Sequence, residues 1–476
     1  MLTSRASEIL ENTHLKNPLD DSGKAREFVD GIKDRAEAKG FSFQVLKEGE
    51  SKGSRARLGI LRTRHGLVET PCFVPVATLA SVRSLDYIDL ASLGIPSVLA
   101  NTYHLHLRPG DELIRKLGGL HKFMAFDGPI FTDSGGFQAF SLGFGREHNI
   151  SKIGGVFPDP DRSSIKAHSL RRSNLTKITG EGVHFKSLHD GGWHFLNPEI
   201  SMRIQSNLGS DVIMAFDECT SPLSDYDYTK EAMERTHRWA QQSLKFHNPN
   251  QAIYGIIQGG WFEDLRMEST EFTSSQPFDG IAIGGSLGEN KQDMHKILDW
   301  VIPKLDSRPR HLLGIGDVDD LFEGVERGID TFDCVSPTRI ARRGSLHITP
   351  QAGGCQKNKF RIDVKALKFK EDPRPIDPYC SCPTCQRYSR AYLWHLYHAK
   401  ELSYFRLASI HNLHFMLRLM ESIRESIAQD TFRELKDQWL GKALPRETSE
   451  EISRGKSGCN ESGPNGDRVC GDDLDA

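Results

Sequence analysis

The chain has 476 residues, of which 37% are hydrophobic and 26% are charged, and its formal net charge is −3 at pH 7. These values fit a protein with a sizeable core, built as two or three average domains or as one large α/β barrel with additions. They exclude a globally basic nucleic-acid binder, and no apolar run reaches the ~18 residues that a membrane helix needs.

Residues 1–52 form a polar extension at the amino end. This segment has no apolar signal core, and its ten acidic residues stand against nine basic ones. Signal peptides and transit peptides have the opposite character. Nine cysteines, three of them within six residues, suit a reducing compartment with one metal site better than a disulfide framework. We therefore expect a cytoplasmic protein with no membrane association.

Short apolar runs alternate with longer amphipathic stretches from residue 96 onwards, a pattern that indicates parallel βα units. The amphipathic stretches include residues 228–247, 291–305 and 318–328, and we expect helices there. The seven runs are PSVLANTY (96–103), PIFTDSGG (129–136), DVIMAFDE (211–218), AIYGIIQGG (252–260), DGIAIGG (279–285), RHLLGIGD (310–317) and TFDCVSPT (331–338).

Polar residues or paired glycines end each of these runs. Because the carboxyl ends of the strands meet at one mouth of a (β/α)8 barrel, we predict an α/β fold of this class, a TIM barrel, over residues 53–442. A doubly wound open sheet also gathers ligands at strand ends and is the alternative. The residues are Asn101, Asp133, Asp217, Gln258, Gly284, Gly285, Asp317 and Asp333.

Three further segments interrupt or follow the barrel pattern. Residues 144–176 are polar and rich in Arg and Ser, which is typical of an inserted functional or mobile loop. Residues 443–476 are rich in Ser, Gly, Glu and Asp and are predicted to be a disordered tail. Between them, residues of about 350–415 hold the cysteine cluster, and we expect an inserted zinc-binding subdomain there.

Cys380, Cys382 and Cys385 form a C-x-C-x-x-C motif, and His411 follows after twenty-five residues in a helical stretch. Three thiolates and one imidazole complete a tetrahedral zinc shell without an open position, which is typical of a structural site. We therefore expect one structural zinc ion per chain. His414 is a competing ligand.

Asp133, Asp217 and Asp333 are the acids expected at the barrel mouth. Paired carboxylates indicate glycosidic chemistry, in which one attacks the anomeric carbon and the other transfers protons. A single Asp at a strand end is as often a helix cap or a turn former. Cys334 has no His nearby in the sequence to activate it, so we assign it to packing and favour Asp333 as the nucleophile.

A local basic patch follows Asp333. Residues 339–370 contain nine Lys or Arg residues against Asp363 as the one acid. A run of charge is usually a solvated face, but this imbalance favours a surface that binds phosphate groups.

These motifs, in their order and spacing, resemble the queuine/tRNA-guanine transglycosylase family over roughly residues 53–430. The resemblance rests on FTDSGGFQ, DECT, GIIQGG, IAIGG, GVERGIDTFDCVSPTR and the C-x-C-x-x-C motif with its distant His. It implies a (β/α)8 barrel with a zinc subdomain. It also implies a pentosyltransferase that exchanges guanine at the wobble position, 34, of GUN-anticodon tRNAs for a 7-deazaguanine base in queuosine synthesis.

The resemblance also implies residue roles. Asp333 resembles the nucleophile that forms a covalent ribosyl intermediate, and Asp133 resembles the general acid/base. The tRNA loop would be held by arginines, and zinc by Cys380, Cys382, Cys385 and His411. The base would be bound by Asp217, Cys219, Gln258, Gly284 and Gly285. The arginines expected to hold the tRNA loop, which match or adjoin the family positions, are Arg339, Arg342 and Arg343.

Cys219, in DECT, resembles the residue of bacterial enzymes that use preQ1, so preQ1 is the favoured incoming base. The stretch GGSLGEN departs from the usual GGLAVGE of bacterial members. Its first five residues, GGSLG, resemble some host-dependent bacterial homologues, for which queuine salvage is the rival, so queuine stays the rival here. A homodimer is expected from the family. The alternative functions are a non-catalytic RNA-binding subunit of the same fold and a hydrolase that gives the ribosyl intermediate to water.

Overall fold

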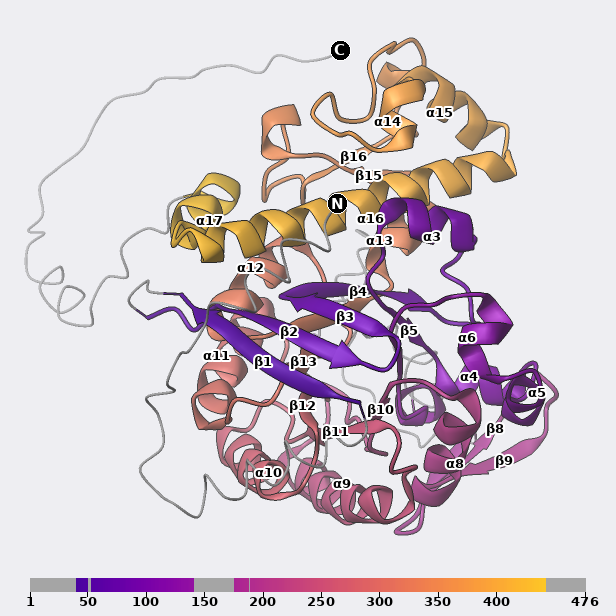
Figure 1. The fold of residues 1–476 in the computed structure, drawn as a ribbon, viewed down its shortest axis with the longest axis vertical. Coiled ribbons are helices and arrows are strands. Elements are labelled where there is room, and N and C mark those ends of the chain that lie inside the picture. Colours follow the sequence, from indigo (N-terminus) through magenta and orange to yellow (C-terminus); the bar gives the residue numbers. More distant parts are fainter. Residues whose placement is uncertain (1–39, 50–52, 141–174, 188, 442–476) are drawn as a thin grey trace, which may run out of the picture.

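The computed structural model describes residues 40–49, 53–140, 175–187 and 189–441, and its centre is a closed barrel of eight parallel strands (Figure 1). The barrel closes where the last strand pairs with the first, Thr331 lying beside Cys72. This closure confirms the (β/α)8 prediction and excludes the open sheet. The strands are β4 (Cys72–Ala77), β5 (Val98–Ala100), β6 (Ile130–Thr132), β10 (Val212–Met214), β11 (Ala252–Ile257), β12 (Gly280–Ile283), β13 (Arg310–Leu312) and β14 (Thr331–Cys334).

Seven of the eight strands lie inside the predicted apolar runs, and β4 was missed. Its sequence, CFVPVA, follows Pro71 and contains Pro75. Proline lacks a backbone N–H and is depleted in central strands, so its presence argued against a strand there. In the barrel Pro75 lies beside Cys334, at the last register position of the β14–β4 pair. The closure of the barrel therefore overrides the local preference.

Helices follow the strands and cover the outside of the barrel. The predicted helical stretches 228–247, 291–305 and 318–328 correspond to α9, α11 and α12. α9 begins two residues before the predicted stretch, and Gly328 caps α12 with a φ of 98°. Acidic residues in the first turn of α12 complement its dipole. The helices up to the barrel's last strand are α3 (Tyr87–Leu93), α4 (Thr102–Leu107), α5 (Asp111–Lys116), α6 (Gly119–Met124), α8 (Pro198–Leu208), α9 (Tyr226–Phe246), α10 (Glu263–Ser275), α11 (Lys291–Val301), η1 (Ile302–Lys304) and α12 (Val318–Arg327).

A three-stranded antiparallel sheet closes the amino-terminal end of the barrel. It consists of β1 (Ser42–Glu48), β2 (Arg57–Thr63) and β3 (Gly66–Thr70), and Phe41 packs edge-on against Tyr254 of the barrel interior at 6.2 Å between ring centroids. β1 lies within the segment expected to be a polar extension. Residues 1–39 of that extension, most of the expected insertion and the tail fall outside the described residues. A second small sheet precedes α8 and contains β7 (Thr176–Ile178), β8 (Val183–Lys186) and β9 (Trp193–Leu196).

The segment after β14 has a hydrophobic core of its own, formed by residues such as Leu346, Leu393 and Leu407. α16, a helix of 27 residues, separates this core from the barrel in Figure 1 and contacts both. The elements are α13 (Ser336–Ala341), β15 (Ser345–His347), η2 (Pro350–Ala352), β16 (Arg361–Asp363), η3 (Leu367–Phe369), α14 (Pro383–Arg387), α15 (Arg390–His398), α16 (Leu402–Ala428) and α17 (Phe432–Leu440). Among the described residues no helix is both long and apolar enough to span a bilayer.

Candidate functional site

A cavity of about 1270 Å³ opens at the carboxyl ends of the barrel strands. Residues that follow β5, β6, β10, β12 and β14 line it, as expected for a TIM barrel. Most of the predicted site residues border this one cavity, namely Asp133, Asp217, Cys219, Gly285, Asp333, Arg339, Arg342 and Arg343. Gln258 and Gly284 lie directly behind the lining: Gln258 contacts Asp217, and Gly284 lies beside Gln258.

Asp133 follows β6 and is held by groups from two neighbouring segments. The backbone N–H of Thr102 donates to Oδ1 at 2.9 Å. The side-chain amides of Asn101 and Gln138 donate to Oδ2, that of Gln138 at 3.2 Å. Burial raises the pKa of the carboxyl, the Thr102 hydrogen bond lowers it, and the charge of Asp333 raises it further, to about 7. A carboxyl with this pKa gives and takes protons with similar ease near neutral pH.

Asp217 follows β10 and is buried at the floor of the cavity. Its Oδ1 accepts a hydrogen bond from the Ser134 hydroxyl at 2.8 Å, and its Oδ2 accepts one from Gln258 Nε2 at 2.7 Å. Gln258 is also buried, and no hydrogen-bond partner of its Oε1 is found in the part of the chain that the structure describes. Buried polar atoms are rarely left unpaired, so this end of the cavity is chemically incomplete without a polar ligand.

Gly284 and Gly285, which follow β12, leave room for the side chain of Gln258 because they carry no side chains of their own. Gly285 has a φ of +76°, and a Cβ there would lie 2.2 Å from Gln258 Oε1; a Cβ on Gly284 would lie 2.6 Å from Ile256. Side chains at these two positions would therefore clash with the groups that shape the cavity.

Asp333 lies on β14, and its Oδ1 accepts two hydrogen bonds from the neighbouring strand and the turn that follows it. Gly314 N donates at 2.9 Å, and His311 Nε2 lies 3.2 Å away. His311 Nδ1 is 2.8 Å from the Thr331 hydroxyl. A nitrogen facing a carboxylate carries the proton, so the tautomer has Nε2–H donating to Asp333 and Nδ1 accepting from Thr331. His311 is fully buried, and this contact orients the carboxylate.

The two cysteines near the acids differ from activated nucleophiles. Burial raises the pKa of the Cys334 thiol to about 12, and its Sγ accepts a hydrogen bond from Ser336 N at 3.3 Å. A thiol in this state is protonated at neutral pH, in agreement with its assignment to packing. Cys219 borders the cavity on the side of Asp217, and its Sγ lies 3.8 Å from the Thr220 carbonyl oxygen.

A cluster of cations forms one rim of the cavity, namely Arg83, Arg339, Arg342, Arg343 and Lys359. Partial burial lowers the pKa of Arg342, and the charges of Arg83, Arg339 and Arg343 lower it further. Such mutual repulsion is relieved by an anion, so the rim is suited to a phosphate group. The sequence did not reveal Arg83, which lies about 250 residues before the others in the chain.

The cysteine cluster has the dimensions of a tetrahedral metal site. The Sγ atoms of Cys380, Cys382 and Cys385 lie 3.7, 3.5 and 3.3 Å from His411 Nδ1. Zinc bonds of about 2.3 Å to sulfur and 2.0–2.1 Å to nitrogen give a tetrahedral S···N edge of about 3.6 Å. The four residues are therefore able to bind a metal ion such as zinc.

The position of His411 is fixed by the backbone of β15. Its Nε2 lies 2.7 Å from the His347 carbonyl oxygen, so Nε2–H donates to it and the lone pair of Nδ1 faces the three sulfurs. His414, on the next turn of α16, also comes within 3.5 Å of Cys380 Sγ through its Nδ1. The two histidines thus share one face of the helix, but His411 is the one within reach of all three cysteines.

Several groups of the site were missed by the sequence analysis. Ser134, Phe137 and Gln138 lie within FTDSGGFQ, and Phe137 is a partly exposed aromatic ring on the cavity wall. Their position in that motif was the available signal. No sequence motif indicated a role for His311, because it lies within an apolar run that predicts only a buried strand.

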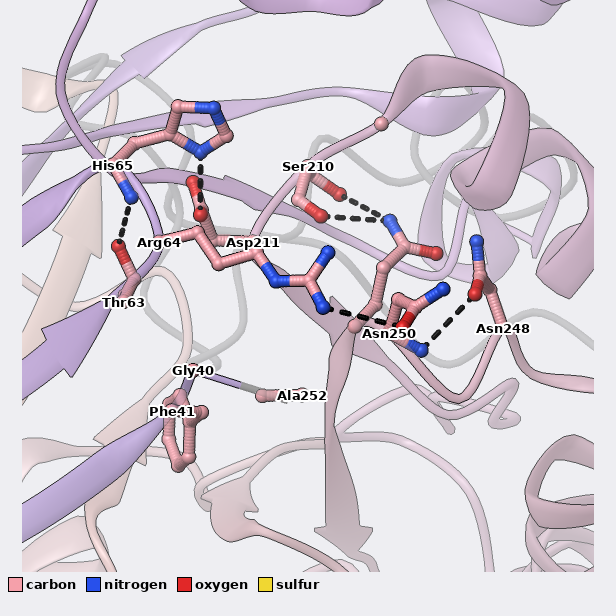
Figure 2. A pocket seen from close by; sticks show the side chains of 12 residues that line it. Gly40, Phe41, Thr63, Arg64, His65, Ser210, Asp211, Asn248, Asn250 and Ala252 are labelled. Atoms are coloured by element: carbon pink, nitrogen blue, oxygen red, sulfur yellow. Dashed lines mark hydrogen bonds and ion pairs between the residues drawn. The ribbon is translucent and has the colours of Figure 1, made fainter. Parts of the chain in front are cut away.

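A smaller hollow of about 200 Å³ lies at the opposite end of the barrel, beside the turn between β2 and β3 (Figure 2). There His65 and His121 stack at 3.5 Å between ring centroids, and both contact the Asp211 carboxylate, at 2.7 and 3.2 Å. This arrangement ties the turn to the barrel.

Comparisons with known proteins agree with this geometry. A family model described as queuine tRNA-ribosyltransferase matches residues 51–444. A protein of Archaeoglobus fulgidus is 57% identical over 390 residues, which cover 81% of this chain and 97% of that protein. The queuine tRNA-ribosyltransferases of Roseiflexus sp. and Caldanaerobacter subterraneus are 46% and 45% identical, covering 83% and 84% of this chain and 98% and 97% of their own lengths.

Proposed function

This chain belongs to the queuine tRNA-ribosyltransferase family of pentosyltransferases, and we propose how its cavity exchanges guanine at position 34 of GUN-anticodon tRNAs for a 7-deazaguanine base. The observation that carries the proposal is the placement of Asp133 and Asp333 on one cavity, with Asp217 and the unpaired Gln258 Oε1 at its floor. A neutral base with several donors and acceptors fits such a floor.

Base recognition is assigned to Asp217, Cys219, Gln258, Gly284 and Gly285. Asp217 accepts hydrogen bonds from the donor edge of the base, where Ser134 and Gln258 now donate to it. Phe137, on the cavity wall, offers an aromatic face for the ring. The extruded nucleotide is thereby held with its glycosidic bond between the two catalytic acids.

The exchange proceeds through two displacements at C1′ of the ribose. An oxygen of Asp333 bonds to C1′ while the C1′–N9 bond breaks, and the leaving guanine takes a proton from the Asp133 carboxyl. The incoming base then gives its N9 proton to the Asp133 carboxylate, its N9 bonds to C1′, and the bond from C1′ to Asp333 breaks. His311 and the Gly314 amide keep the Asp333 carboxylate in place throughout.

We assign tRNA binding to Arg339, Arg342 and Arg343, together with Arg83. These residues form the rim next to Asp333, where the backbone phosphates of an extruded nucleotide would lie. Their clustering next to the acids supports this role, because an isolated rim of like charge is stabilised when a polyanion binds.

The incoming base is proposed to be preQ1, with queuine as the rival. Support comes from Cys219, which borders the cavity at the position that resembles preQ1-using enzymes. Purified protein is incubated with a GUN-anticodon tRNA and labelled guanine, with unlabelled preQ1 or queuine as competitor. preQ1 competing at the lower concentration supports the proposal, and queuine competing better overturns it.

The same assay separates the alternatives. A non-catalytic RNA-binding subunit binds the tRNA without incorporating guanine, and a hydrolase releases guanine without replacing it. Asp333→Ala is expected to abolish incorporation and any covalent tRNA adduct, whereas Cys334→Ser, the matched neighbour on β14, is expected to retain both. An adduct that persists in Asp333→Ala would assign the nucleophile to Cys334.

We further propose that the ion at Cys380, Cys382, Cys385 and His411 is zinc, one per chain, and that its role is structural. The four-residue shell has no open position, and it joins α14 to α16. We also propose a homodimer. Light scattering at micromolar concentration is expected to give twice the chain mass, and a monomeric mass would contradict this.

A further inference from the structure

Arg266, on α10, is fully buried behind the base pocket and uses every N–H of its guanidinium group on backbone carbonyl oxygens. Nε donates to Gly260 at 2.7 Å, Nη1 donates to Ile257 and Gly284 at 3.0 Å, and Nη2 donates to Gly284 at 3.0 Å and to Ser286 at 2.7 Å. A guanidinium has five N–H donors, so the group is saturated. Burial lowers its pKa to about 9, and its charge is compensated by peptide dipoles.

The bonded carbonyls belong to the two turns that we assign to base recognition. Ile257 and Gly260 flank Gln258, and Gly284 and Ser286 flank Gly285. One side chain therefore couples the turn after β11 to the turn after β12. Arg266 itself does not line the cavity, whereas Gly285 does.

The direction of one peptide group follows from this contact. In a trans peptide the carbonyl of residue 284 and the N–H of residue 285 point in opposite directions. Because Arg266 draws the Gly284 carbonyl away from the cavity, the Gly285 N–H points towards it. Among the described residues no hydrogen bond from this buried amide is found, so its partner is expected from a ligand.

We propose that Arg266 is a positioning residue that determines the specificity of the base pocket, by holding both turns so that an N–H donor at residue 285, and not a carbonyl, faces the base. The group recognised there is then an acceptor, such as the 6-carbonyl oxygen of a guanine-type base. This inference rests on the proposed function, since it takes the cavity to be the base pocket.

Arginine is required at this position for a geometric reason. Lysine carries its three donors on a single nitrogen. It therefore cannot donate at the same time to the carbonyls after β11 and to those after β12, as the planar guanidinium group does. Arg308 is the matched control. It is also buried, and it also donates to backbone carbonyls, those of Ser274 at 2.7 Å, Gln276 at 2.9 Å and Phe278 at 3.0 Å. These lie at the opposite end of β12 from the cavity, and Arg308 additionally pairs with the Asp306 carboxylate, at 2.7 Å through Nη2.

The test compares binding of guanine with binding of 2-aminopurine, which lacks the 6-carbonyl oxygen, in the wild type, Arg266→Lys, Arg266→Gln and Arg308→Lys. The wild type is expected to prefer guanine. Arg266→Lys is expected to reduce this preference by about tenfold, the effect of one misaligned hydrogen bond to the base. Arg308→Lys is expected to lower the melting temperature while leaving the preference within about twofold of the wild type.

An unchanged preference in Arg266→Lys would overturn the proposal, because Arg266 would then act on stability alone. Failure of both Arg266 variants to fold, with Arg308→Lys folded, would overturn it as well. The proposed function fails separately: a wild type that binds guanine but incorporates none into tRNA would refute base exchange, and the binding preference would still test Arg266.

Discussion

Replacing Asp133 by Asn removes a carboxyl whose pKa differs greatly between the folded and the unfolded chain. Burial, with the charge of Asp333 adding to it, raises the pKa in the folded protein to about 7 from an ordinary value of 3.8. Between these two values the folded protein binds a proton that the unfolded chain has released. Stability contributed by Asp133 is therefore present at low pH and is lost as the pH rises towards about 7.

The magnitude follows from the two pKa values. Raising the pH from about 5 to about 8 lowers the free energy of unfolding of the wild type by roughly 3 kcal/mol through this group alone. Asn keeps the shape and has no such titration. As the pH is raised over this interval, the free energy of unfolding of Asp133→Asn is therefore expected to increase relative to that of the wild type by this amount.

Urea denaturation of both proteins at several pH values measures this difference, and the titrating groups that do not interact with Asp133 cancel in it. Asp333→Asn is the matched control: it removes the neighbouring charge, lowers the pKa of Asp133 and is expected to shrink the pH-dependent gap. Parallel stability curves for the wild type and Asp133→Asn would refute the reasoning. Base exchange by Asp133→Asn is expected to fall to background.

Four further outcomes are expected. Cys385→Ser, or removal of the metal by a chelator, lowers the melting temperature by more than about 5 °C, and metal analysis of the variant gives less than one ion per chain. His311→Phe lowers kcat by about tenfold or more with an unchanged KM for tRNA, because the carboxylate of Asp333 loses its orienting donor. Arg342→Ala weakens tRNA binding and reduces the slope of log affinity against log salt by about one, while the KM for guanine is unchanged. Lys359→Ala, at the same rim, has the same effect on the salt slope.

The local sequence pattern was sufficient to predict most of the barrel strands, one helix boundary and the metal site of this protein. Apolar runs with polar tips placed seven of the eight barrel strands, and acidic first turns with a following glycine placed α12. The spacing of Cys380, Cys382 and Cys385 indicated a metal site because thiols so close in a chain reach one ion. The order of the motifs indicated the family. Except for the order of the motifs, each of these signals depends on residues within a few positions of one another.

The eighth strand and the supporting groups of the site were decided by tertiary structure. β4 contains a proline that argues against a strand, and only the need to close the barrel between β14 and β5 places it there. His311 and Arg266 read as ordinary strand and helix residues. Their functional contacts, to Asp333 and to the turn at Gly284, join residues 22 and 18 positions apart.

The sequence by itself thus determined the fold class and the family, and it named the candidate acids and metal ligands, because chemistry and periodicity are written in local residue type. Only the tertiary structure decided which atoms of each carboxylate accept hydrogen bonds and from which donors. A carboxylate acquires its pKa and its orientation from the burial, charges and donors around it, as Asp133 does from Thr102 and Asp333. Those neighbours come together only when parallel strands bring their carboxyl ends to one mouth.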